Sequence, residues 1–176
     1  MADPVIPGLT RDRWPSDATY NQAASDPGFR RDDELTTRRT MRTLSDIHEE
    51  YDFLDADDRY RLLIELGREL EPMPDALKTD ATMVRGCSAS VWVYPVATED
   101  GSLHFLAESN AAITKGIIAL VLSAVQDRPA AAVAAMDIAE ALDPFDLKNQ
   151  LSSNRTQGLP NMIALIREHA ARIAAA

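Results

Sequence analysis

The sequence predicts an α+β fold in which α-helices pack on one face of a small antiparallel β-sheet. Apolar residues recur at helical spacing on both sides of a central region rich in β-branched and aromatic residues. This central region contains the pair Asp100-Gly101, which suits a tight turn between two antiparallel strands. The order of helices, a β-meander and further helices therefore indicates a small sheet covered by helices.

Two amphipathic helices are predicted in the region that begins near Thr40, and they form a helical hairpin. The acidic turn between them carries Asp55, Asp57 and Asp58, which offer an N-cap for the second helix. Prolines 72 and 74 end that helix. The apolar faces consist of Leu44, Ile47, Tyr51 and Leu54 in the first helix and Leu62, Leu63, Leu66 and Leu70 in the second.

A β-hairpin is predicted in the middle of the chain. Residues 90–96 read Ser-Val-Trp-Val-Tyr-Pro-Val and form the first strand. A turn at residues 99–102 leads to the return strand at residues 103–107. Trp92 and Tyr94 are interpreted as residues that pack on the sheet.

Several helices follow the hairpin. The first begins at Asn110, a good N-cap, and its broad apolar face predicts a central place in the core. Pro129 lies near an N1 position, and Asp143-Pro144 begins a short helix through Leu151. A polar loop, residues 152–157, precedes the last helix. The apolar faces consist of Ile113, Ile117, Leu120, Val121 and Ala124 in the central helix and Leu159, Met162, Ile163, Ile166 and Ala170 in the last.

The chain divides into an N-terminal arm, residues 1–38, and one domain, residues 39–176. The arm holds four of the ten prolines, and its apolar residues follow no helical or strand period. We expect it to be extended or disordered. The alternative is that Trp14, Tyr20 and Phe29 fasten it to the domain surface.

Composition indicates which ligands the protein is not expected to bind and in which cellular compartment it is expected to lie. The formal net charge of −10 does not favour nucleic acid, which calls for a basic face. The longest apolar run, residues 116–125, is too short to cross a bilayer, and the N-terminus shows no signal pattern. One cysteine allows no intramolecular disulfide and fits a reducing compartment. We therefore expect a cytoplasmic protein that acts on neither membranes nor nucleic acid.

Metal binding within one chain is not expected. A zinc site or an iron–sulfur cluster normally requires several thiolate or imidazole ligands. Beside the one cysteine, the chain has three histidines. His48, His104 and His169 are scattered and form no pair at helical ligand spacing.

Cys87 is the candidate nucleophile. It follows Gly86, which permits a tight turn and the close approach of a partner backbone, and it precedes the first strand. Arg85 lies two residues away, and nearby positive charge favours the thiolate. Two alternatives stay open: Cys87 is a small buried hydrophobe, or it serves a thiol hydrolase, for which no histidine lies in a recognisable context.

Four stretches in order along the chain resemble motifs of the SufE family. Residues 83–92, Met-Val-Arg-Gly-Cys-Ser-Ala-Ser-Val-Trp, resemble the active-site loop with its Gly-Cys pair and its Val-Trp pair. Residues 58–67 resemble the signature of the first helical hairpin, residues 109–116 a segment ending in Lys-Gly, and residues 151–159 a Leu-(Ser/Thr)-x-x-Arg-x-x-Gly-Leu loop. The resemblance covers residues 40–174. The sequence departs from the pattern at Ser88-Ala89-Ser90, where many members carry Gln-Ser-Gln.

The resemblance implies a fold like that of the iron–sulfur scaffold proteins, with the cysteine at a loop tip. It implies that Cys87 accepts persulfide sulfur from a cysteine desulfurase, SufS-like or Csd-like, stimulates that enzyme and passes the sulfur to an iron–sulfur scaffold complex. Pyridoxal phosphate is then expected on the desulfurase, with no cofactor on this chain and no stand-alone turnover.

The residues expected to bind the partner or support the thiolate are Arg155, Arg85, Gly86 and Ser88. A planar guanidinium at Arg155 suits a partner carboxylate, although a solvated surface arginine is the alternative. Gly158 is interpreted as part of a loop-to-helix transition, with Gln157 as a capping residue. Lys115 and the acidic turn at residues 55–58 are interpreted as surface features.

Two other functions stay open beside the sulfur carrier. A non-catalytic binding module would only regulate a cysteine desulfurase. A cluster scaffold would need thiolates from several chains, because each chain supplies one.

Overall fold

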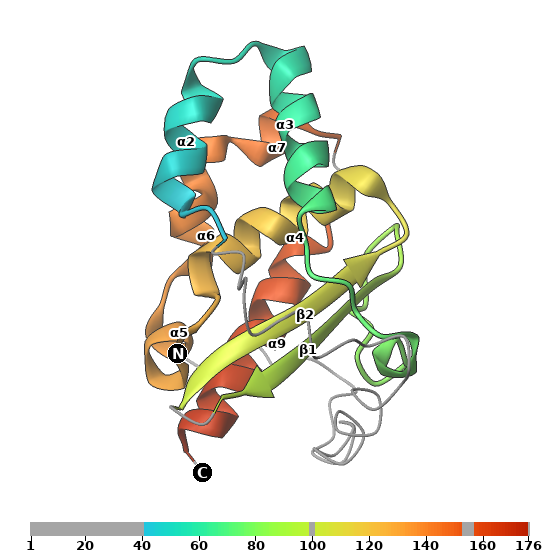
Figure 1. Cartoon of the computed structure of the whole chain (residues 1–176), viewed down its shortest axis with the longest axis vertical. Helices are drawn as coiled ribbons and strands as arrows, with labels where there is room; N and C mark the ends of the chain where they lie inside the picture. Colours follow the sequence, from blue (N-terminus) through green and yellow to red (C-terminus); the bar gives the residue numbers. More distant parts are fainter. Residues whose placement is uncertain (1–40, 99–100, 153–156, 176) are drawn as a thin grey trace, which may run out of the picture.

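The computed structural model describes residues 41–98, 101–152 and 157–175, so the predicted arm and part of the predicted turn at residues 99–102 lie outside the described residues. The α+β fold is confirmed (Figure 1). In chain order, the elements are α2 (Leu44–Asp52), α3 (Ala56–Arg68), the 3₁₀ helix η1 (Asp75–Leu77), β1 (Val91–Ala97), β2 (Ser102–Ser109), α4 (Ala112–Val125), β3 (Arg128–Pro129), α5 (Ala130–Ala135), α6 (Ile138–Leu142), the 3₁₀ helix η2 (Asp143–Phe145), α7 (Leu147–Gln150) and α9 (Leu159–Ala174).

The sheet is antiparallel and has the order β1-β2-β3. The predicted hairpin is present, and its register pairs Val91 with Ser109 and Ala97 with Leu103. The short strand β3 was not predicted, because two residues are too few to show a period. It places Pro129 opposite Ser102, so this proline precedes α5 as its N-cap and is not its first residue.

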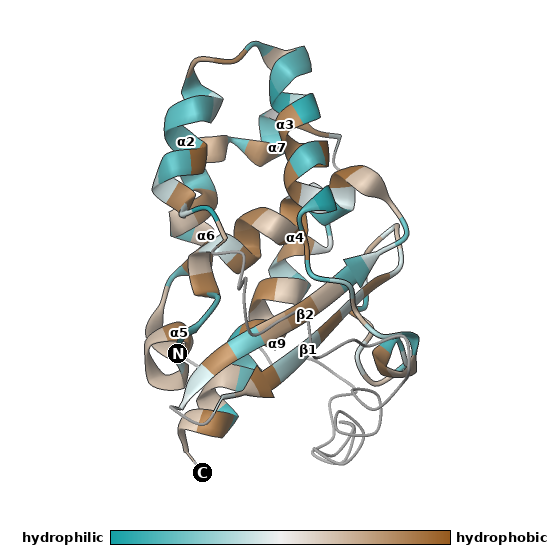
Figure 2. Cartoon of the chain, in the orientation of Figure 1, coloured by the Kyte–Doolittle hydropathy of each residue, from teal (hydrophilic) through white to brown (hydrophobic). Residues whose placement is uncertain are grey.

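Helix α4 is the centre of the core, as its apolar face predicts. Ten of its residues are buried, and its ribbon is largely brown and tan (Figure 2). It lies against β2 and crosses α3 at a point where two glycines meet. A Cβ built on Gly116 would lie 2.2 Å from the Leu63 carbonyl oxygen, so the two helix backbones come too close for any side chain there.

The two faces of the sheet are covered differently. Helix α9 lies behind the strands in the view of Figure 1 and α4 runs above them, and the main apolar core lies between these two helices and the sheet. On the opposite face, a smaller cluster forms under η1. It consists of Met73, Leu77, Tyr94 and Leu106, with Trp92 and Val96 packed against it. The α-helices therefore lie on one face as predicted, while η1 covers part of the other.

Three details of the predicted helices differ from the structure. The helix expected from Asp143 to Leu151 is divided into η2 and α7 by Asp146, which has a left-handed φ of 46°. An aspartate tolerates this conformation, and the chain changes direction there.

The last helix buries Leu165 and His169, which were not predicted, whereas Leu159 and Ile163 are half-buried. The acidic turn behaves as predicted, since Asp55 caps α3 and accepts a hydrogen bond from the Asp58 N–H.

In the part of the chain that the structure describes, no helix has both the length and the apolar character that crossing a membrane requires.

His104 on β2 forms side-chain contacts with two other segments, through Glu71 and Asp127. Its Nδ1 lies 2.8 Å from the Asp127 carboxylate and its Nε2 lies 2.8 Å from the Glu71 carboxylate. Burial lowers the pKa of His104, but hydrogen bonds and charge from Glu71 and Asp127 outweigh that effect and the pKa is raised overall. The charged imidazolium, which donates from both nitrogens, therefore fits this site.

We expect His104→Gln to cost about 1–2 kcal/mol of stability at about pH 5.5 and less at about pH 9. A pKa raised by folding contributes stability that is present below the unfolded pKa and is lost as the pH rises through the folded pKa. Urea unfolding of both proteins at the two pH values measures this difference. A cost that does not shrink with pH would contradict the role of the imidazolium.

Candidate functional site

Cys87 lies at the tip of a loop that extends the sheet. Residues 82–84 pair with β1, because the Val84 N–H donates to the Val91 carbonyl at 2.8 Å and the Val93 N–H donates to the Thr82 carbonyl at 2.9 Å. Met83 and Trp92 form an antiparallel bridge between them. Residues 85–90, here called the cysteine loop, close this stem. The loop is thus attached to the sheet through the pairing of residues 82–84 with β1.

Two features of the structure favour glycine at position 86. Its φ of 81° is in the left-handed region, which favours glycine. A Cβ at this position would also lie 2.5 Å from Nδ2 of Asn161 in α9. The expectation that Gly86 acts through geometry therefore has a specific physical basis.

Two asparagines from distant segments hold the ends of the cysteine loop. Asn161 Nδ2 donates to the Arg85 carbonyl at 2.8 Å, and Asn110 Oδ1 accepts from the Ser90 N–H at 3.0 Å. The prediction that Asn110 caps the central helix was wrong, because Ala111 occupies the N-cap of α4. Spacing along the sequence could not reveal either contact, because each joins segments that only folding brings together.

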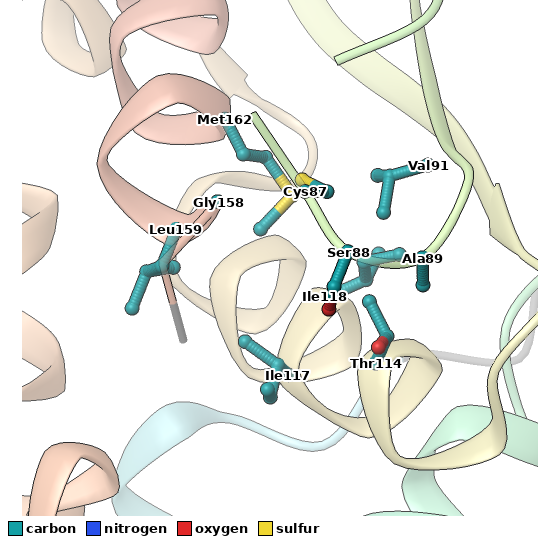
Figure 3. A pocket seen from close by; sticks show the side chains of 10 residues that line it. All are labelled: Cys87, Ser88, Ala89, Val91, Thr114, Ile117, Ile118, Gly158, Leu159 and Met162. Atoms are coloured by element: carbon teal, nitrogen blue, oxygen red, sulfur yellow. The ribbon is translucent and has the colours of Figure 1, made fainter. Parts of the chain in front are cut away.

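Cys87 faces a pocket between the cysteine loop, α4 and the start of α9 (Figure 3). Most of the lining residues have apolar side chains, while polar atoms, including the hydroxyl groups of Thr114 and Ser88, form about half of the exposed lining surface. The lining residues are Cys87, Ser88, Ala89, Val91, Thr114, Ile117, Ile118, Gly158, Leu159 and Met162. Such a pocket can hold a weakly solvated group on the cysteine and keep water from it.

Gly158 provides the space that the Cys87 side chain occupies. A Cβ at position 158 would lie 2.0 Å from Cys87 Sγ and 3.1 Å from the Cys87 Cα. The φ of Gly158 is −85°, which any residue adopts, so contact with the cysteine and not backbone conformation requires a glycine here. Gly158 is also the N-cap of α9, which agrees with a loop-to-helix transition, although the cap is Gly158 and not Gln157.

Burial controls the chemistry of the thiol. Cys87 is half-buried, and desolvation raises the pKa of its thiol above the ordinary value. Arg85 is exposed and does not offset this effect. At neutral pH the resting side chain is therefore mainly the protonated thiol, the less nucleophilic form.

The other candidate residues occupy different surroundings. Ser88 is exposed at the edge of the pocket. Arg155 lies outside the described residues, in the segment that precedes Gly158 in the sequence. Lys115 forms an ion pair with Glu108. Within the described ranges, no group of three histidine, cysteine, aspartate or glutamate side chains could hold a metal ion.

The raised pKa predicts a slow reaction of the folded thiol. We expect the rate of Cys87 alkylation by iodoacetamide to rise with pH around a midpoint above that of the same chain in denaturant, where a free cysteine titrates at about 8.5. Mass spectrometry of timed samples gives the rates. A folded-state midpoint equal to or below the denatured one would contradict desolvation as the controlling effect.

The contact at Gly158 predicts a coupling between two positions. Gly158→Ala should cost about 1–3 kcal/mol of stability, because the new methyl group overlaps Cys87. In a Cys87→Ala background the cost should be smaller, since Sγ is gone while the contacts with the backbone remain. A double-mutant cycle by urea unfolding measures this coupling, and strictly additive effects would contradict the contact.

Comparison with known proteins agrees with this arrangement. The model of the SufE family, described as an Fe-S metabolism associated domain, matches residues 45–170. An uncharacterized SufE-like protein of Rhizobium meliloti is 37% identical over 134 residues, which are 74% of this chain and 96% of that protein. The sulfur acceptor protein CsdE of Escherichia coli is 39% identical over 103 residues, 58% of this chain and 70% of CsdE.

A solved structure shares the fold. The solution structure of a hypothetical protein from Thermus thermophilus superposes with a TM-score of 0.62 at 16% identity, covering 76% of this chain and 96% of that one. The family match spans the cysteine loop, the pocket and the greater part of α9. This chain therefore belongs to the SufE family.

Proposed function

We propose that this chain accepts persulfide sulfur from a pyridoxal-phosphate-dependent cysteine desulfurase onto Cys87 and passes it to an iron–sulfur scaffold complex. The placement of Cys87 carries this proposal: the one cysteine of the chain lies at a loop tip, beside an apolar pocket that can receive an added sulfur atom. Membership of a family associated with Fe-S metabolism supports it, as does the relative that is named a sulfur acceptor protein.

The transfer is an exchange reaction without net oxidation. The Cys87 thiolate attacks the terminal sulfur of the partner's persulfide and forms a new S–S bond. The S–S bond within the partner's persulfide breaks, and the partner's cysteine leaves as a thiolate. Cys87 then carries the persulfide, and the same type of exchange delivers its outer sulfur to the next acceptor.

The pocket and the raised thiol pKa serve different stages of this reaction. Ile117, Ile118 and Met162 give the pocket an apolar wall, against which a persulfide would be less exposed to water and small thiols than at a free loop tip. The same burial disfavours the thiolate before transfer. A partner that draws Cys87 out of the pocket, or that supplies a base, would remove this barrier, so reactivity would arise on docking.

The partner contacts are assigned to the exposed end of the loop. Arg85 and Ser88 are exposed beside Cys87 and can meet the desulfurase surface. Arg155 is assigned to a partner carboxylate or to the thiolate on the basis of its motif. Removal of sulfur regenerates the partner's thiolate, so we expect this chain to stimulate the desulfurase, whether of the SufS or the Csd type.

Intact mass after incubation with a cysteine desulfurase and L-cysteine tests the proposal. We expect the folded protein to gain about 32 Da, a gain that mild reduction removes and that Cys87→Ser lacks. Urea unfolding of the variant verifies that it is folded. No gain with either desulfurase type, together with stimulation by Cys87→Ser, would favour a regulatory binding module instead.

A further inference from the structure

The Arg85 end and the Ser90 end of the cysteine loop are held in different ways. At the Ser90 end, Asn110 makes two hydrogen bonds to one residue, since its Oδ1 accepts from the Ser90 N–H at 3.0 Å and its own N–H donates to the Ser90 carbonyl at 3.3 Å. At the Arg85 end, the described contact across to α9 is the 2.8 Å hydrogen bond from Asn161 Nδ2, and it is exposed to solvent. The described contact of the Arg85 end with α9 therefore depends on one side-chain hydrogen bond, while residues 82–84 before it pair with β1.

We infer that Asn161 is a positioning residue that holds the cysteine loop against α9 and thereby sets how much of the time Cys87 is inside its pocket. This inference extends the proposed sulfur transfer, because the docked loop protects Cys87 and the released loop presents it to a partner.

The first turn of α9 receives the cysteine loop at two points. Gly158 leaves room for Cys87 Sγ, and Asn161, three residues later, binds the backbone of Arg85. Residues three apart lie on the same face of a helix, so a single helix face contacts both the side chain and the backbone of the loop. Release of the backbone bond therefore favours withdrawal of Cys87 from Gly158.

Gly86 makes room for the hydrogen bond between Asn161 and Arg85. Asn161 Nδ2 occupies the place of the missing Gly86 side chain, at 2.5 Å from an ideal Cβ. The amide can reach the Arg85 carbonyl because that space is empty. An exposed hydrogen bond exchanges with water at small net cost, so loss of this one should change the docked-to-released ratio about two- to tenfold.

The test compares Asn161→Ala with the wild-type chain and with Asn149→Ala, a matched control. Asn149 is also an exposed asparagine whose Nδ2 makes a hydrogen bond, to Asp146 at 2.7 Å, but it lies in α7. The readout is the alkylation rate of Cys87 with iodoacetamide on the plateau above the thiol pKa. We expect an increase of about two- to tenfold for Asn161→Ala and no change for Asn149→Ala.

A second variant separates hydrogen bonding from shape. Asn161→Asp keeps the size of the side chain but cannot donate to the Arg85 carbonyl, so it should also accelerate alkylation. Measurement on the plateau prevents the new charge from acting through the thiol pKa. Rates equal to wild type in both folded variants would overturn the inference, and acceleration by Ala without acceleration by Asp would assign the effect to packing.

The sulfur-transfer assay then tests whether the hydrogen bond between Asn161 and Arg85 affects the proposed function. With a cysteine desulfurase, Asn161→Ala should lower the apparent KM for this chain by a similar factor, because more of it is competent to bind. The persulfide formed on the variant should be lost faster to added glutathione. If wild type gains no sulfur, the proposed function fails, yet the alkylation rates still decide whether Asn161 holds the loop.

Discussion

The placement of α4 is the constraint on which the rest of the structure depends. This helix is buried on most sides because it packs against β2 and also against α3, where Gly67 and Gly116 allow the backbones to touch. The same helix supplies Ile117 and Ile118 to the pocket beside Cys87. A change that moved α4 away from α3 would therefore also alter the wall against which the cysteine is held.

The site combines protection with low intrinsic reactivity, and both have one cause. Withdrawal of Cys87 against Gly158 shields the sulfur, and the same desolvation raises the pKa of the thiol. A carrier of reactive sulfur benefits from this arrangement, since an exposed thiolate would react with any small disulfide or oxidant. Under the proposed function, reactivity would depend on a partner that changes the surroundings of the loop.

Small residues and amides, more than charged groups, build this site. Gly86 and Gly158 each leave a space that another segment fills, Asn161 in one case and Cys87 in the other. Asn110 and Asn161 fasten the backbone without adding charge near the sulfur. The family match spans the cysteine motif, whereas the precise fit of the loop comes from these packing contacts.

The sequence by itself determined the order of the elements, the hairpin that leads from Cys87 and the central place of α4, because periodicity and turn chemistry are local properties. It also pointed to Cys87 and Gly86 as a pair. Only the tertiary structure decided that Gly158 faces Sγ, that Asn110 binds the loop in place of capping a helix, and that Asn161 reaches the Arg85 carbonyl. The two asparagine contacts join residues 20 and 76 positions apart, so no local pattern encodes them.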